Sequence, residues 1–102
     1  MLVAYDDWPD GMAVGLKGHV ECSYARLVEV FGPPNITIDK YNKSDAEWLL
    51  RDTVTHEYAT IYNYKDGKNY MGKDGLPVEQ ITDWHVGGVT HLALQLVLEA
   101  IQ

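Results

Sequence analysis

The sequence predicts a small α+β domain, in which an antiparallel sheet of three or four strands packs against two helices, the second at the C-terminus. Three observations support this fold class. Residues 23–34 combine an apolar helical face with clear boundary signals. Residues 57–64 alternate as a β-strand does, and residues 90–102 are helical in pattern and strongly apolar.

The first predicted helix begins after Ser23 and ends before Gly32. A serine hydroxyl accepts a hydrogen bond from a free backbone N–H of the first turn, so Ser23 is suited to the N-cap. The sequence Gly32-Pro33-Pro34 stops the helix, because glycine favours the position after the last turn and proline cannot continue it. The apolar residues between these signals recur at helical spacing: Tyr24, Leu27, Val28 and Phe31.

Residues 46–51 and 57–64 are predicted to form a hairpin. Side chains alternate between the two faces of a strand, so Ala59 and Ile61 share the core face with Trp48 and Leu50. The opposite face then carries a ladder of polar and aromatic residues, at Tyr58, Thr60, Tyr62 and Tyr64. This ladder serves either as ordinary cross-strand packing or as a binding surface.

The remaining segments complete a single domain over residues 1–102. Residues 1–15 are predicted to form an irregular N-terminal arm or a turn between short extended pieces, and Trp8 is expected to pack this segment onto the body. Residues 36–38 allow a short strand. Residues 65–77 form a long glycine-rich loop, and a strand over 81–86 ends at Gly87-Gly88. The last helix, capped by Thr90, is apolar around most of its circumference. It is therefore either enclosed by the sheet and first helix or packed on a second copy as a homo-oligomer.

Composition limits the function classes. The chain has 102 residues, of which 46% are hydrophobic and 23% charged, as in an average globular domain. No apolar run approaches the roughly 20 residues that a membrane-spanning helix needs. The formal net charge of −7 argues against direct nucleic-acid binding, which requires a cationic surface.

Motifs for catalysis are missing from the sequence. None of the four histidines has the local spacing of a metal site, and no serine lies in a Gly-x-Ser-x-Gly elbow. No glycine-rich loop precedes a Lys-Ser or Lys-Thr pair, as a P-loop requires. We therefore expect no enzymatic activity, no metal and no cofactor.

A candidate binding surface follows from the strand that contains Asp83-Trp84-His85. If Trp84 packs in the core, His85 lies on the exposed face beside the tyrosine ladder. Aromatic side chains stack on bases and lysines pair with phosphate, so this surface suits a nucleotide. The candidate binding residues are Tyr62, Tyr64, Lys65, Lys68, Tyr70, His85 and Asp83.

Four motifs, in this order along the chain, carry a resemblance to a known family. They are Phe-Gly-Pro-Pro-Asn at 31–35, Ala-Glu-Trp at 46–48, Ala-Thr-Ile-Tyr-Asn-Tyr-Lys-Asp-Gly-Lys-Asn-Tyr at 59–70, and Asp-Trp-His-Val-Gly-Gly at 83–88. With them the chain resembles a family of small accessory proteins encoded by tailed bacteriophages and prophages. The family carries a tight Asp-Gly turn in the hairpin, whereas this sequence has Thr55-His56-Glu57.

The resemblance implies a phage protein that acts in the cytoplasm of the host bacterium, and the absence of a targeting signal at the N-terminus fits this. We expect a non-catalytic binding protein with a counter-defence role. Its expected partner is a host immune component such as a CRISPR nuclease complex, which it would inhibit as an anti-CRISPR protein by occluding a site. The alternatives are sequestration of a nucleotide immune signal and a structural or assembly role in the virion.

Overall fold

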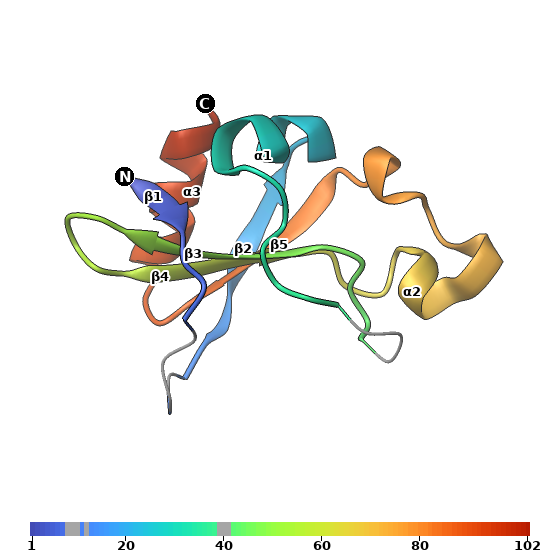
Figure 1. The fold of residues 1–102 in the computed structure, drawn as a ribbon, viewed down its shortest axis with the longest axis horizontal. Helices are drawn as coiled ribbons and strands as arrows, with labels where there is room; N and C mark the ends of the chain where they lie inside the picture. Colours follow the sequence, from blue (N-terminus) through green and yellow to red (C-terminus); the bar gives the residue numbers. More distant parts are fainter. Residues whose placement is uncertain (8–10, 12, 39–41) are drawn as a thin grey trace.

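A computed structural model describes residues 1–7, 11, 13–38 and 42–102 (Figure 1). Within these residues the protein has one antiparallel sheet of five strands and three α-helices, which confirms the α+β class. The strands are β1 (Leu2–Ala4), β2 (Gly15–Glu21), β3 (Glu47–Asp52), β4 (Tyr58–Tyr62) and β5 (Asp83–Gly88). The helices are α1 (Tyr24–Phe31), α2 (Lys68–Met71) and α3 (Leu92–Ile101), and short 3-10 turns cover Gly72–Asp74 and Val78–Gln80.

The sheet has the strand order β1-β3-β4-β5-β2, and every neighbouring pair is antiparallel. Figure 1 shows α1 and α3 on the same side of this sheet, with α2 beyond the end of β4. The core lies between the sheet and the two longer helices. The other face of the sheet carries the side chains of the candidate site.

Two tryptophans position α1 on the sheet. Trp48 and Trp84 are fully buried and meet edge to face, with ring centroids 5.5 Å apart. The Trp84 indole N–H donates to the carbonyl of Cys22, just before α1, at 2.9 Å. The Trp48 indole N–H donates to the carbonyl of Gly32, just after α1, at 2.8 Å. The two ends of α1 are therefore attached to the core by the indole N–H groups of Trp48 and Trp84.

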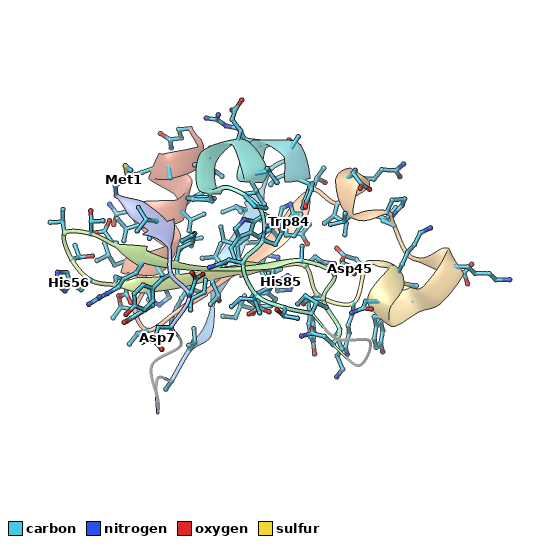
Figure 2. The ribbon with its side chains drawn as sticks, in the orientation of Figure 1. Met1, Asp7, Asp45, His56, Trp84 and His85 are labelled. Carbon is cyan, nitrogen blue, oxygen red and sulfur yellow. The ribbon has the colours of Figure 1, made fainter. Side chains whose placement is uncertain are left out.

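The local predictions for α1 and the hairpin are confirmed. The Ser23 hydroxyl accepts from the Arg26 N–H at 3.1 Å, as an N-cap does. The predicted core-facing residues of the hairpin are all buried, with no exposed surface: Trp48, Leu50, Ala59 and Ile61. Figure 2 shows Trp84 on the helix side of the sheet and His85 on the opposite side, as the alternation predicts.

The prediction of three or four strands is wrong, because the sheet has five. The irregular arm predicted over residues 1–15 contains β1 and the start of β2, which correspond to the short extended pieces of the alternative prediction. Both are edge strands, so each pairs on one side only and shows little apolar alternation. In β2 the pattern is further broken by a register shift between Leu16 and Gly18. A Cβ on Gly18 would lie 2.7 Å from Leu94 Cδ2, so this glycine allows α3 to approach. The expected packing of Trp8 falls outside the described residues.

The predicted end of the last strand at Gly87-Gly88 is also wrong, because both glycines belong to β5. They pair with Thr60 and Ala59 of β4. A Cβ on Gly88 would lie 2.3 Å from the Cβ of Ala93. This glycine therefore marks a close approach of α3 and does not mark a turn.

The segment predicted as a loop over 65–77 contains α2 and a 3-10 turn, closed by a bridge between Gly67 and Leu76. The structure therefore has one helix, α2, in addition to the two that the sequence predicts. The short strand allowed over 36–38 does not form. The side chain of Asn35 takes its place at the sheet, because its amide accepts from the Leu49 N–H and donates to the Leu49 carbonyl.

The terminal helix α3 packs one side against the rest of the chain, while Leu98 on it is 40% exposed. Ala93 and Val97 are fully buried, and the helix contacts β5, β2, β4, β1 and α1. The Thr90 hydroxyl accepts from the Leu92 N–H at 3.3 Å, so the predicted cap lies one residue before the assigned one, His91. A homo-oligomer through this helix stays a prediction. Among the described residues no helix has the length and apolar character needed to cross a membrane.

The β3–β4 turn is built on the side chain of Asp52. The Asp52 carboxylate accepts from the N–H groups of Val54 and Thr55 and from the Thr55 hydroxyl. It also pairs with the Met1 ammonium at 2.7 Å. His56 completes the turn in the left-handed region, with φ of 65°.

Asp52→Asn is expected to lower the melting temperature by about 5 °C at neutral pH. The Met1 ammonium and then the turn N–H groups lower the pKa of the Asp52 carboxyl below its ordinary range. Stabilisation by a carboxyl with a lowered pKa is present above its unfolded value, about 3.9, and is lost as the pH falls through the folded value. The melting temperature should therefore fall less steeply for the variant than for the wild type as the pH is lowered from neutral to strongly acidic. The control Asp74→Asn, at an exposed position, should show the pH dependence of the wild type. If the melting temperatures of Asp52→Asn and the wild type change in parallel with pH, the stabilising role of the Asp52 carboxylate is contradicted.

Candidate functional site

Four side chains from four strands form one row across the face of the sheet opposite α1 and α3. His19 of β2 lies opposite His85 of β5, His85 opposite Tyr62 of β4, and Tyr62 opposite Glu47 of β3. Residues directly opposite each other in a sheet project to the same face with their Cβ atoms about 5 Å apart. The row therefore places two imidazoles, a phenol and a carboxyl side by side.

The rings of this row pack against one another. The His85 ring lies 4.2 Å from the His19 ring and 5.3 Å from the Tyr62 ring, measured between centroids. Tyr64, which follows β4, meets His85 edge to face at 5.8 Å. Asp83 contacts the outer end of the row, because its carboxylate lies 3.1 Å from His19 Nδ1. Together these contacts form an aromatic cluster on this face of the sheet.

Lysines surround the Tyr64 end of the cluster. The ammonium of Lys65 lies 5.2 Å from the Tyr64 ring and 5.4 Å from the Tyr70 ring. The ammonium of Lys43 lies 5.9 Å from the Tyr64 ring. Lys65 adopts the left-handed backbone region with φ of 67°, and its N–H donates to the Lys43 carbonyl at 2.9 Å. This conformation is unfavourable for a lysine, and the surrounding fold stabilises it at the edge of the site.

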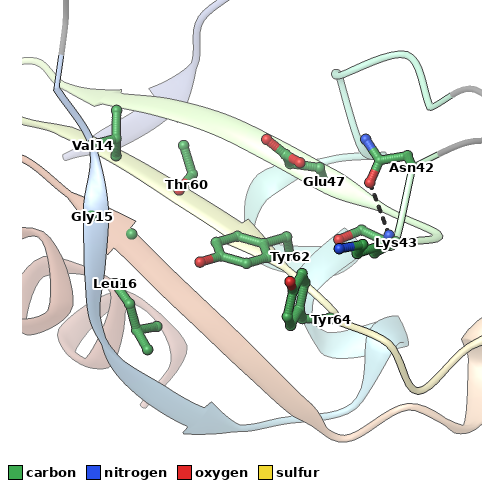
Figure 3. A pocket seen from close by; sticks show the side chains of 11 residues that line it. Val14, Gly15, Leu16, Asn42, Lys43, Glu47, Thr60, Tyr62 and Tyr64 are labelled. Carbon is green, nitrogen blue, oxygen red and sulfur yellow. Dashed lines mark hydrogen bonds between the residues drawn. The ribbon is translucent and has the colours of Figure 1, made fainter. Parts of the chain in front are cut away.

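Beside the row runs a groove of about 480 Å³ (Figure 3). Its residues come from the start of β2, from the segment before β3, and from β3, β4 and β5: Val14, Gly15, Leu16, Asn42, Lys43, Ser44, Glu47, Thr60, Tyr62, Tyr64 and Gly87. Figure 3 shows the Tyr62 ring extending from β4 across the sheet toward β2. Two glycines leave room there, and a Cβ on Gly87 would lie 2.5 Å from Thr60 Oγ1.

Burial changes the acid–base properties of the site. It raises the pKa of the Glu47 carboxyl above its ordinary value. Burial, then the charges of Glu47 and Tyr64, raise the pKa of the Tyr62 phenol. Burial, then the neighbouring His19, lower the pKa of His85, so its imidazole is neutral at neutral pH. His85 Nδ1 is buried and has no hydrogen-bond partner among the described residues, so this ring acts as an aromatic surface.

Six of the seven residues predicted as a binding surface are connected by these contacts. Asp83 joins through His19, and Tyr70 joins through Lys65. Lys68 is exposed on α2 and makes no ion pair or ring contact with the described residues. Sequence reasoning missed His19, Lys43 and the groove. The position of Glu47 could have been predicted, because the residue before a core-facing Trp48 projects to the opposite face of the strand.

Two further observations bear on the chemistry of the site. No group of three or more His, Cys, Asp or Glu side chains is arranged to hold a metal ion in the described part of the chain. Comparisons with protein-family models, curated proteins and solved structures give no significant match. The resemblance to phage accessory proteins therefore stays a prediction.

Proposed function

We propose that this protein is a non-catalytic binding protein that holds a nucleotide in the groove on the sheet face opposite α1 and α3. The observation that carries the proposal is the groove's wall, where the Tyr62 and Tyr64 rings lie beside the lysine at position 43. A volume of about 480 Å³ lies within the usual range for small-molecule sites, roughly 300–1,000 Å³.

The two ends of such a ligand find different partners. A base stacked on a protein aromatic ring gains about 1–3 kcal/mol, and the Tyr62 ring borders the groove. Phosphate oxygens accept charge-assisted hydrogen bonds from lysine, and the ammonium groups of Lys43 and Lys65 both lie near Tyr64. Neither end requires a metal or a cofactor.

Sequestration fits the predicted biological setting. A phage accessory protein in the bacterial cytoplasm would act against host defence by withdrawing a nucleotide signal. A small binding domain with a preformed groove is sufficient for that role, because binding alone removes the signal from its receptor. The resemblance in the sequence supports this setting.

Tyr62→Ala is expected to weaken nucleotide binding about tenfold or more, because the stacking surface is lost. Lys65→Asn is expected to weaken binding less, by a few-fold, because it removes one cation while asparagine tolerates the left-handed backbone of residue 65. Affinities for cyclic and linear nucleotides would be measured by isothermal titration calorimetry, after a thermal-shift screen that detects ligands through their stabilisation of the folded state.

Two controls keep this test specific. Tyr62→Phe keeps the ring and should bind like the wild type. Lys73→Asn removes the same charge from an exposed turn and should leave the affinity unchanged. If no nucleotide raises the melting temperature of the wild type at millimolar concentration, the proposed function is wrong.

The alternative is inhibition of a host immune protein through an acidic surface. Asp6 and Asp7 are both exposed in the N-terminal segment, which favours contact with a basic protein surface. Reversing both charges would then weaken capture of a stoichiometric host protein and reduce the salt dependence of binding. If reversing these two charges does not change capture of the host protein, and a nucleotide raises the melting temperature, nucleotide sequestration is favoured.

A further inference from the structure

Glu47 is the feature of the groove that the proposed function leaves unexplained. Its carboxyl lines the groove, is half-buried, and makes no hydrogen bond or ion pair with the described residues. Partial burial of an unpaired carboxylate is costly, and N–H donors that approach it reduce this cost. A ligand bound in the groove would lie where it can supply such donors.

The position of Glu47 defines which part of the ligand it meets. Glu47 and Tyr62 are opposite each other in neighbouring strands. Figure 3 shows both side chains extending in the same direction across the sheet. A base stacked against Tyr62 would therefore present one of its edges to the Glu47 carboxyl.

Hydrogen-bond chemistry then selects the base. A carboxylate is an acceptor with two oxygens, so it binds two adjacent N–H donors best. The Watson–Crick edge of guanine presents such a pair, from N1 and the 2-amino group. Adenine, cytosine and uracil each place an acceptor next to their donor, which would face a carboxylate oxygen unfavourably.

We propose that the groove selects guanine nucleotides, with the Glu47 carboxylate accepting hydrogen bonds from N1–H and the 2-amino group while the base stacks on Tyr62. This inference rests on the proposed nucleotide-binding function. A free guanidinium, such as an arginine side chain, offers similar donors. The groove also contains Lys43, which repels a cation and attracts the phosphate of a nucleotide.

The test compares two ligands that differ only in the base, guanosine and adenosine 5′-monophosphate, by isothermal titration calorimetry. The wild type is expected to bind the guanine nucleotide about tenfold more tightly or better, because a bidentate contact discriminates strongly between bases. Glu47→Gln should remove this preference by weakening guanine binding about tenfold, and should leave adenine binding within about twofold. Glutamine replaces an unpartnered side chain with one of the same shape, and a melting curve verifies that the variant folds.

A pH series provides a second readout. Because burial raises the pKa of Glu47, its carboxylate is protonated at a higher pH than an ordinary glutamate. The affinity for the guanine nucleotide should therefore fall as the pH decreases through the raised pKa of Glu47, while the affinity for the adenine nucleotide changes less. In Glu47→Gln the pH dependence specific to guanine should disappear.

The possible failures are distinguishable. Equal binding of the two nucleotides by the wild type would overturn the guanine assignment and leave the proposed function intact. Failure of both nucleotides, with the rest of the nucleotide panel also inactive, would overturn the proposed function itself. Binding of free arginine that depends on Glu47, without binding of the guanine nucleotide, would assign the groove to a cationic partner and overturn the inference.

Discussion

Trp84→Ala is expected to lower the free energy of unfolding by about 3–5 kcal/mol, the usual cost of deleting a large aromatic side chain from a core. The Trp84 side chain has no exposed surface and packs against the rings of Trp48 and Tyr24. Its removal leaves a cavity and leaves the Cys22 carbonyl without the indole donor that holds the start of α1. Because domains of this size have a total stability of about 5–15 kcal/mol, a large unfolded fraction is expected.

Urea denaturation followed by circular dichroism measures this loss. His85→Ala is the matched comparison, because the neighbouring residue projects to the opposite face of the same strand and should cost far less. Leu98→Ala removes a partly exposed side chain from α3 and should change stability by about 0.5 kcal/mol or less. A larger loss for His85→Ala than for Trp84→Ala would mean that the two faces of β5 are reversed.

Asn63→Asp is expected to lower the free energy of unfolding by about 3 kcal/mol or more. Asn63 is fully buried, and its amide oxygen accepts from the N–H groups of Asp45 and Ala46. Its amide nitrogen donates to the carboxylates of Asp45 and Asp66, at 3.0 and 2.9 Å. The substitution keeps the shape of the side chain, but it replaces the amide donor with a third carboxylate beside those of Asp45 and Asp66.

The destabilisation should depend on pH. Repulsion raises the folded pKa of the added carboxyl group, so its cost is present at neutral pH and diminishes as the pH falls and the group is protonated. Gln80→Glu adds the same charge at an exposed position and serves as the control. Hydrogen exchange should show the loss first in residues 64–76, which Asn63 connects to the start of β3. An Asn63→Asp variant as stable as the wild type at neutral pH would contradict the role of this amide.

The parts of the fold that sequence reasoning predicted are those with local signals. Ser23 and Gly32 define α1 through hydrogen bonds within a few residues of each helix end. The alternation of β4 predicted which side chains enter the core, because a central strand is paired on both sides and has one fully apolar face. The alternation around Trp84 predicted that His85 lies beside Tyr62 or Tyr64, and the ring contacts of His85 with both tyrosines confirm this.

The missed elements lack such signals. The edge strand β2 is largely exposed and carries glycines at positions 15 and 18, so its sequence resembles a loop. Missing β2 also concealed His19, which joins the row only through pairing with β5. Gly88 was interpreted as a strand end, although its missing side chain serves a contact with α3.

The sequence by itself determined the α+β fold class, the two longer helices α1 and α3, and the face on which the tyrosines and His85 lie, because helix caps and strand alternation act over a few residues. Only the tertiary structure decided the order of the strands and the composition of the groove. The groove joins residues from positions 14–16, 42–47, 60–64 and 87, and no local pattern encodes which of these distant segments become neighbours. Their proximity depends on long-range strand pairing and on the close approaches that individual glycines permit.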